Sequence, residues 1–135
     1  MERLHIVGRR PLAGEVAVSG SKNASLALLA ASLLSDTPVR IAGMPRLGDV
    51  ATMRQLLHQL GAPATVDAHD LWHIDPSSAD RHQPSETLVR QTRASICLLG
   101  PLLATQGRGV IALPGGCNLG HRPVDLHLRG LRALG

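Results

Sequence analysis

The stretch that decides the fold is NASLALLAASLL, residues 23–34, because it recurs as RASICLLGPLLA at residues 93–104. Both copies carry an Ala-Ser pair followed by an almost continuous apolar run, and an Ile-Ala pair follows each at the same offset. Beyond that point the offset grows by four residues, so that the Leu-Gly pairs at 60–61 and 134–135 align. Such a period is longer than those of the common solenoid repeats. The chain is therefore predicted to be an α/β protein with about two copies of a β-α-β-α-β-β unit.

The first copy is predicted to span about residues 14–75 and the second about residues 86–135, where it stops before its hairpin. The apolar residues of 23–35 surround the whole helix, which indicates a helix buried on every side. Residues 47–61 form an amphipathic pattern that predicts a helix ended by Gly61. Its apolar face is predicted to contain Val50, Met53, Leu56, Leu57 and Leu60.

Short strands are predicted on both sides of the first helix pair, from runs of β-branched and other apolar residues between turn residues. LHIVGR (4–9) and GEVAVSG (14–20) read as two strands joined by a turn at 11–14. PVRIAGM (38–44) reads as a third strand. PATVDA (63–68) and LWHID (71–75) read as a hairpin, followed by a loop over 75–85.

Composition excludes several classes of protein. The 135 residues are 44% hydrophobic with no Phe or Tyr, which suits one domain with an aliphatic core. We expect no membrane span and no signal peptide, so the cytoplasm is the expected location. Two cysteines make no disulfide framework and lack zinc-site spacing. The net charge of +4 comes from scattered arginines and one lysine, without a basic run or aromatic platform, so no nucleic-acid binding is expected.

SGSKNAS (19–25) places Lys22 and Asn23 at the start of the first apolar helix. Asn23 is a suitable N-cap, and the free N–H groups at a helix start attract anions, which the Lys22 charge would reinforce. The alternative is a capped helix beside a solvated lysine. The stretch is not a P-loop, because Ser21 separates Gly20 from Lys22. Arg93 occupies the matching place in the second copy, either as a site residue or as a surface arginine.

PGGCNLGHRPVDLH (114–127) is a Gly-rich loop around one thiol. Cys117 follows two glycines and precedes His121 and Arg122, and positive neighbours convert a thiol into a useful acid or nucleophile. The alternative is an inert cysteine buried in a turn. Cys97 is the reverse case, because it lies in an apolar helix and is expected to pack in the core.

The loop is followed by a predicted helix, with Pro123 near its first turn. Asp125 would then lie in the first turn, where it either binds a ligand or interacts with the helix dipole. The role of His127 stays open. Asp49, at the start of the amphipathic helix, is predicted to be a cap.

Together, SGSKNAS, TRAS, PGGCNLGHRPVDLH and the closing Leu-Gly resemble the N-terminal part of the UDP-N-acetylglucosamine 1-carboxyvinyltransferases, which open peptidoglycan synthesis. The resemblance covers essentially the whole chain. It implies an inside-out α/β barrel, the enolpyruvyl transferase fold, here incomplete, with residues 1–20 as strands that pair with a second domain and 21–135 as part of the first. Family members are much longer, so these 135 residues alone are expected to be inactive.

The resemblance also implies roles for individual residues, in the transfer of an enolpyruvyl group from phosphoenolpyruvate to UDP-N-acetylglucosamine without a cofactor or metal. Cys117 matches the proton-donating cysteine that can form an adduct with phosphoenolpyruvate and on which fosfomycin acts. His127 continues the same motif, while Gly48 stands where many members have lysine. The residues matched to phosphoenolpyruvate are Lys22, Asn23 and Arg122, and those matched to UDP-N-acetylglucosamine are Arg93, Arg122, Pro123, Val124, Asp125 and Leu126.

Two alternatives remain beside this interpretation. The chain could be an inactive fragment or a ligand-binding half of such an enzyme. The shikimate-phosphate enolpyruvyl transferase shares the repeat, but it lacks the Gly-Gly-Cys loop.

Overall fold

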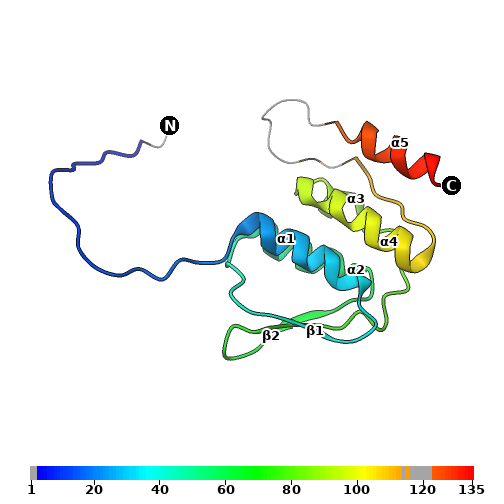
Figure 1. Ribbon diagram of the computed structural model, residues 1–135, viewed down its shortest axis with the longest axis horizontal. Helices are drawn as coiled ribbons and strands as arrows, with labels where there is room; N and C mark the ends of the chain where they lie inside the picture. The colour runs from blue at the N-terminus through cyan, green and yellow to red at the C-terminus, as the bar shows by residue number, and fades with distance from the viewer. Residues whose placement is uncertain (1–2, 114, 116–122) are drawn as a thin grey trace.

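Two helices lie side by side over a small sheet in the computed structural model, which describes residues 3–113, 115 and 123–135 (Figure 1). Two short helices and one longer one follow, and a last helix lies at the end of the molecule opposite the sheet. In chain order the elements are α1 (Lys22–Ala31), the 3-10 helix η1 (Ser32–Leu34), β1 (Val39–Ile41), α2 (Gly48–Gln59), β2 (Ala64–Val66), β3 (Trp72–Ile74), α3 (Glu86–Val89), the 3-10 helix η2 (Arg93–Leu98), α4 (Leu99–Gln106) and α5 (Asp125–Ala133).

The sheet has the order β1-β3-β2, with β3 antiparallel to both neighbours. Ile74 of β3 lies opposite Val39 of β1 on one side and Ala64 of β2 on the other. This confirms the predicted strand at 38–44 and the predicted hairpin. The hairpin turn is held by Asp67, whose Oδ1 accepts hydrogen bonds from the backbone N–H groups of His69 at 2.8 Å and Leu71 at 3.1 Å.

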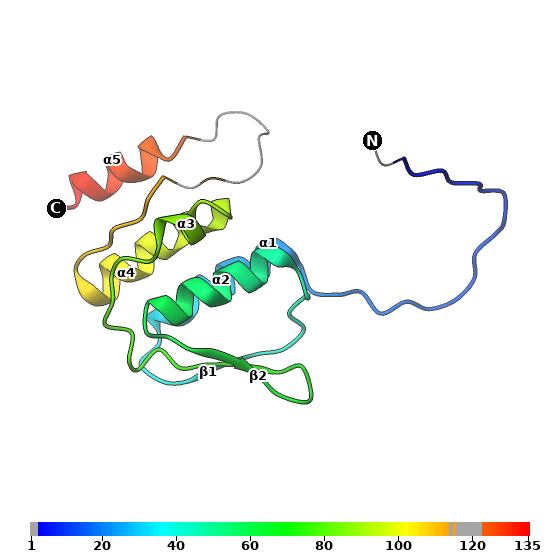
Figure 2. The same cartoon turned by 180° about the vertical axis from the view of Figure 1, so that it is seen from behind.

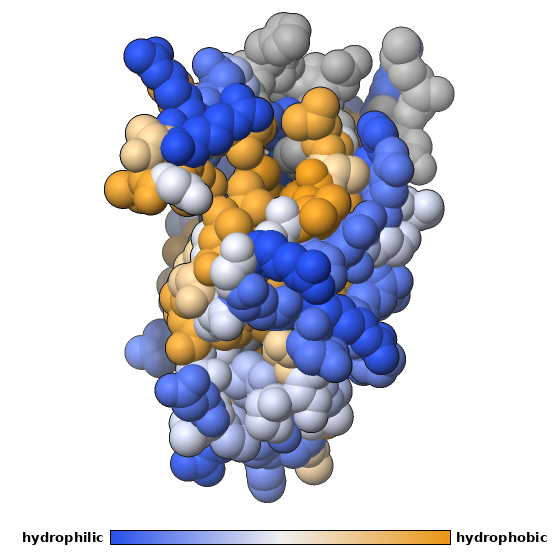
Figure 3. Space-filling model, turned by 90° about the vertical axis from the view of Figure 1, so that its right-hand side faces the viewer, coloured by the Kyte–Doolittle hydropathy of each residue, from blue (hydrophilic) through white to orange (hydrophobic). Residues whose placement is uncertain are grey.

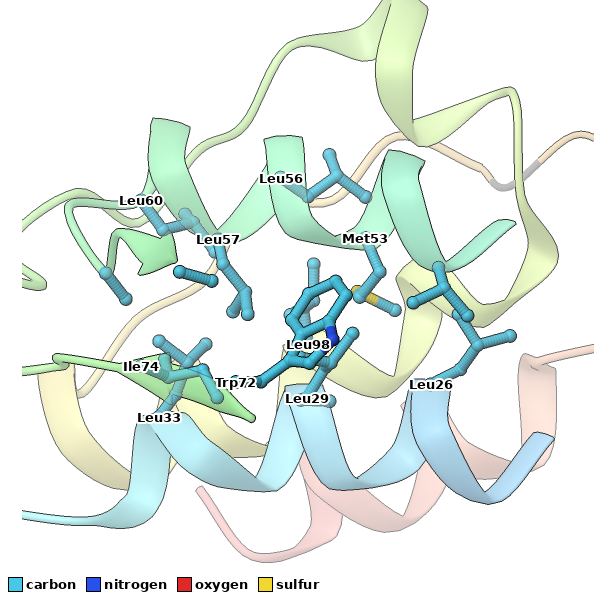
Figure 4. Packing of buried hydrophobic residues seen from close by; sticks show 14 of the residues in the cluster. Leu26, Leu29, Leu33, Met53, Leu56, Leu57, Leu60, Trp72, Ile74 and Leu98 are labelled. Atoms are coloured by element: carbon cyan, nitrogen blue, oxygen red, sulfur yellow. The ribbon is translucent and has the colours of Figure 1, made fainter. Parts of the chain in front are cut away.

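The core lies between α1, α2 and the sheet (Figure 4). Leucine side chains of α1 and η1 point toward α2, and Trp72 of β3 belongs to the same buried cluster. The predicted apolar face of α2 is confirmed, because its five members are all buried. The helix also ends as predicted, since Gly61 has a φ of 90° and a side-chain Cβ there would lie 2.2 Å from the carbonyl oxygen of Ser78.

The first apolar helix is not buried on every side, and that expectation was wrong. Leu29 is fully buried, whereas its neighbour Leu28 is 50% exposed and Leu34 of η1 is 53% exposed. Successive helical residues point about 100° apart, and α1 has α2 on one side and η2 on another. None of the described elements covers the face that carries Leu28.

The two strands predicted within residues 4–20 do not form. Residues 3–20 contain neither helix nor strand and extend away from the body of the molecule (Figures 1 and 2). Their apolar side chains are exposed, with Leu4 at 87% and Val18 at 94%. A strand is stable only when its N–H and C=O groups pair with a neighbouring strand, and the described part of the chain provides none for this segment.

The second repeat keeps its helices but has no strand within the described residues 107–113. Its apolar stretch begins as the 3-10 helix η2 and continues as α4, which ends at Gly107 in the left-handed conformation. The helix predicted after Pro123 is confirmed as α5, but none of its residues is buried. Apolar side chains gather on the surface at the level of α4 and α5, while the level of the sheet is largely hydrophilic (Figure 3). None of the described helices is long and apolar enough to cross a membrane.

Candidate active site

The start of α1 is capped by Ser21, so the expectation that Asn23 is the N-cap was wrong. Ser21 has an extended backbone, and its Oγ accepts a hydrogen bond from the N–H of Ala24 at 3.4 Å. Asn23 already lies inside the helix, which leaves its side chain available for other contacts. The buried Ser25 of this repeat donates its hydroxyl hydrogen bond to the carbonyl of Ser21 at 2.8 Å. The matching Ser95 donates to the carbonyl of Thr92 at 2.7 Å, so the two repeats begin their helices in similar ways.

Lys22 and Asp49 join the starts of α1 and α2. The Lys22 Nζ lies 2.8 Å from Asp49 Oδ2, and the two side chains are 48% and 35% exposed. Asp49 is not the helix cap that was expected, because Leu47 holds that position and Asp49 lies in the first turn. A carboxylate in the first turn of a helix is favoured by the helix dipole. The two helix starts therefore place one cation and one anion together, beside Gly48.

A cavity of about 410 Å³ lies where α1, η2 and the start of α5 meet. Packing of α1 against η2 brings the two repeat starts together, although they are far apart in the sequence. The cavity is lined by Asn23, Leu26 and Ala27 of α1, by Arg93, Ala94, Ile96 and Cys97 of η2, and by Pro123, Val124 and His127.

Five residues that the sequence singled out therefore line one cavity: Asn23, Arg93, Pro123, Val124 and His127. Lys22, Asp125 and Leu126 do not line it, although Leu126 is 69% exposed in the first turns of α5. Cys117 and Arg122 lie outside the described residues. The geometry thus gathers three of the five described residues that were predicted for the nucleotide sugar, with Lys22 at the start of the α1 helix that lines the same cavity.

Cys97 is exposed and lines this cavity, so the expectation that it packs in the core was wrong. The reason is the period of η2. A 3-10 helix has three residues per turn, and the buried positions Thr92, Ser95 and Leu98 follow that spacing. Cys97 is not one of these buried positions. The apolar sequence does not reveal which residues are buried, because it is compatible both with an α-helix and with a 3-10 helix.

Gly115, the described glycine of the thiol loop, packs against the end of α3. A Cβ at Gly115 would lie 2.1 Å from the carbonyl oxygen of Arg90, a distance that real side chains do not adopt. Only glycine fits at this position without a shift of the backbone. The chain that leads into the predicted Cys117 loop is therefore fixed beside the residues that precede Arg93.

A larger cavity of about 510 Å³ lies on the other side of α2, beside the β2–β3 hairpin. Trp72, Arg46, Arg54 and Asp67 are among its lining residues, and it contains none of the predicted substrate residues. The pKa of the Asp67 carboxyl is lowered, first by the hydrogen bond to His73 and then by the backbone N–H groups of the turn. No group of three or more His, Cys, Asp or Glu side chains in the described residues could hold a metal ion.

The chain is similar over its whole length to curated enzymes. The enzyme named UDP-N-acetylglucosamine 1-carboxyvinyltransferase from Vibrio vulnificus is 48% identical over the whole chain, and those from Coxiella burnetii and Dinoroseobacter shibae are each 47% identical. The chain spans about a third of the length of these curated relatives, 32% of the Vibrio protein.

The fold has a counterpart among solved structures. The crystal structure of the enolpyruvyl transferase NikO from Streptomyces tendae superimposes with a TM-score of 0.64 at 30% sequence identity, covering 71% of this chain and 22% of that protein. The family model for EPSP synthase (3-phosphoshikimate 1-carboxyvinyltransferase) matches residues 6–135. Because that match covers nearly the whole sequence, the chain belongs to the EPSP synthase family.

Proposed function

We propose that this chain supplies part of the active site of an enzyme that transfers the enolpyruvyl group of phosphoenolpyruvate to the 3-hydroxyl of UDP-N-acetylglucosamine. The observation that carries the proposal is the 410 Å³ cavity, in which Asn23, Arg93 and His127 converge from three elements. Its volume lies in the range of about 300–1,000 Å³ typical of small-molecule sites. The identity of 47–48% to relatives with this activity in their names supports the same substrates.

Phosphoenolpyruvate carries a phosphate and a carboxylate, so its pocket needs fixed cations. Lys22, at the start of α1, is the proposed phosphate contact, with Arg122 as its partner from the loop. Asp49 lies 2.8 Å from the Lys22 ammonium and is proposed to hold this ammonium in place when no substrate is bound. The N–H groups at the start of α1 add positive potential in the same direction.

The chemistry starts with proton transfer. The Cys117 thiol donates a proton to the methylene carbon of phosphoenolpyruvate, and the neighbouring carbon becomes electrophilic. The sugar 3-hydroxyl attacks that carbon and gives up its proton to a base, forming a tetrahedral intermediate. Loss of phosphate together with one proton of the new methyl group gives the enolpyruvyl ether.

The acceptor side of the site is proposed to lie in the cavity itself. Arg93 is suited to the diphosphate of the nucleotide, because its guanidinium can contact two phosphate oxygens at once. Pro123 and Val124 present an apolar surface at the start of α5, which suits one face of the uracil ring. Asp125 and Leu126 follow in the first turn of α5 and complete the proposed nucleotide segment.

Shikimate 3-phosphate is the second candidate acceptor, because the matching family model is named for the enzyme that uses it. The two acceptors are separated by an assay of a catalytically complete protein that contains residues 1–135. Phosphoenolpyruvate is mixed with either acceptor, and the release of inorganic phosphate is measured. We expect release with UDP-N-acetylglucosamine alone. Release with shikimate 3-phosphate alone would overturn the proposal in favour of the second acceptor, and release with neither would overturn both.

A further inference from the structure

One side chain that lines the 410 Å³ cavity carries a thiol and has no role in the proposed function. We propose that Cys97 is a wall residue of the nucleotide-sugar part of this cavity, so that bound UDP-N-acetylglucosamine covers it and shields it from thiol reagents. The inference rests on the proposed function for the identity of the ligand. It adds a second modifiable thiol to the site, on a helix rather than on the Gly-rich loop.

The position of Cys97 follows from the way η2 is buried. Thr92, Ser95 and Leu98 are buried at a spacing of three residues. The Ser95 hydroxyl donates a hydrogen bond to the backbone carbonyl of Thr92, which holds this turn of η2 in place. The opposite side of η2 therefore faces outward. Arg93 and Cys97 both line the cavity from this side, which places the thiol on the same wall as the proposed diphosphate contact.

The other walls enclose Cys97 from two further elements. Asn23 and Ala27 of α1 line the cavity across from η2, while Val124 and His127 line it from the start of α5. Cys97 is nevertheless exposed in this structure. A small reagent can therefore reach the thiol, and a ligand that fills the cavity can exclude the reagent.

The distribution of the proposed substrate residues indicates which ligand covers Cys97. Among the described residues proposed for the nucleotide sugar, Arg93, Pro123 and Val124 line the cavity. Of the two described residues matched to phosphoenolpyruvate, Asn23 lines the cavity, whereas Lys22, the proposed phosphate contact, does not. Phosphoenolpyruvate by itself should therefore leave the thiol accessible.

The test measures the rate at which methyl methanethiosulfonate modifies Cys97. The thiolate attacks the sulfenyl sulfur, a methyl disulfide forms, methanesulfinate leaves, and the thiol proton goes to solvent. The protein is a catalytically complete one that contains residues 1–135, with Cys117→Ser to remove the loop thiol. Mass spectrometry of the peptide that contains Cys97 follows the reaction. At a UDP-N-acetylglucosamine concentration about 100 times its Kd, the rate should fall up to about a hundredfold.

A matched control places a thiol on an exposed helical surface away from the cavity. Ala104 is exposed on α4 and does not line the cavity. Ala104→Cys, combined with Cys97→Ser and Cys117→Ser, should react at a rate that UDP-N-acetylglucosamine does not change. Phosphoenolpyruvate alone should change neither rate. If Cys117→Ser impairs folding, the same peptide is quantified in the unsubstituted protein.

The outcomes separate this inference from the proposed function. If calorimetry shows that UDP-N-acetylglucosamine binds but Cys97 reacts at an unchanged rate, the inference is wrong and the proposed function stands. If the nucleotide sugar does not bind, both are wrong. Equal slowing of the control thiol, equal protection by phosphoenolpyruvate, or no reaction of Cys97 in the free protein would each overturn the inference.

Discussion

The ammonium of Lys22 and the carboxylate of Asp49 lie 2.8 Å apart and connect the first turns of α1 and α2. Both side chains remain partly exposed, so the pair itself contributes little to the free energy of unfolding, on the order of 0–1 kcal/mol. Its importance is positional, because it holds the only lysine of the sequence beside two helix starts.

Lys22→Ala should therefore impair the use of phosphoenolpyruvate rather than the fold. Loss of a charged hydrogen bond of about 1.5–3 kcal/mol corresponds to roughly a ten- to more than hundredfold fall in kcat/KM for phosphoenolpyruvate. The Kd for UDP-N-acetylglucosamine should change much less. Asp49→Asn is the matched control, since it removes the carboxylate charge but keeps the cation, and its thermal midpoint should change little. Unchanged kinetics with phosphoenolpyruvate in Lys22→Ala would remove this lysine from the site.

The two adjacent leucines of α1 should respond very differently to truncation. Leu29 is fully buried against α2, whereas Leu28 is 50% exposed. Leu29→Ala should lower the free energy of unfolding by about 2–5 kcal/mol, because it leaves a cavity in the core. Leu28→Ala should change it by no more than about 0.5 kcal/mol. Urea unfolding followed by the fluorescence of Trp72 measures both. Equal losses would show that the face carrying Leu28 is covered.

The hairpin turn should lose stability in acid through Asp67. The hydrogen bond from His73 and those from the turn N–H groups lower the pKa of the Asp67 carboxyl below its ordinary value of 3.8. A lowered native pKa means that the stabilisation is present above the ordinary value and is lost as the pH falls through the native one. Asp67→Asn should therefore unfold at lower urea than the unsubstituted chain at pH 7. The gap between the two midpoints should close in acid, and a gap that stays constant from pH 7 to below the ordinary value would contradict the assignment.

Gly115 should be intolerant of any side chain. Its Cβ position lies 2.1 Å from the carbonyl oxygen of Arg90, so Gly115→Ala must move the loop that leads to Cys117. A displacement of about 1 Å at a catalytic group can cost up to about a hundredfold in rate, and kcat should fall accordingly. Gly100→Ala is the control, because nothing lies within 4 Å of its Cβ position in α4. Equal kcat values for the two variants would show that the loop start is not tightly placed.

The two thiols should differ in their reaction with an anionic epoxide that resembles phosphoenolpyruvate. Cys97 is exposed and Cys117 is expected to be accessible, so the discrimination is expected to come from Lys22 and Arg122, the residues proposed to bind the anion. The adduct should map to Cys117 by mass spectrometry, and the nucleotide sugar should speed its formation. A predominant adduct on Cys97 would contradict the role proposed for the loop.

The sequence predicted those parts of the fold that depend on local sequence, such as the apolar face of a helix and the residue at which it ends. The apolar face of α2 and its end at Gly61 were confirmed, because spacing and glycine chemistry determine both. The strands predicted within residues 4–20 are absent from this structure, because a strand depends on a partner that its own sequence does not reveal. Their pairing with a second domain stays a prediction. Leu28 was misplaced for a related reason, since an apolar residue shows that a face can be buried but not what is present to bury it.

The sequence motifs singled out residues that the structure brings together, whereas local capping and packing rules misplaced others. The helix-start and post-loop motifs pointed to Asn23, Arg93 and Val124, which lie on one cavity. Capping preference pointed to Asn23, although serine is an equally good cap and Ser21, two residues earlier, has the extended backbone of an N-cap. Cys97 was misplaced because sequence alone did not reveal the 3-10 period of η2, and that period turns the thiol toward the cavity.

The sheet order imposes a sequence of events during synthesis on the ribosome. β1 and β2 do not pair with each other, and each is bonded to β3, the last of the three strands to be made. A nascent chain that has emerged only to residue 66 therefore holds two strands and α2 without any strand pairing to hold them. Emergence of Trp72–Ile74 then completes both ladders in one step and places Trp72 and Ile74 in the core. Folding of this repeat is thus expected to be all-or-none with respect to chain length, with a threshold at the hairpin rather than at either helix.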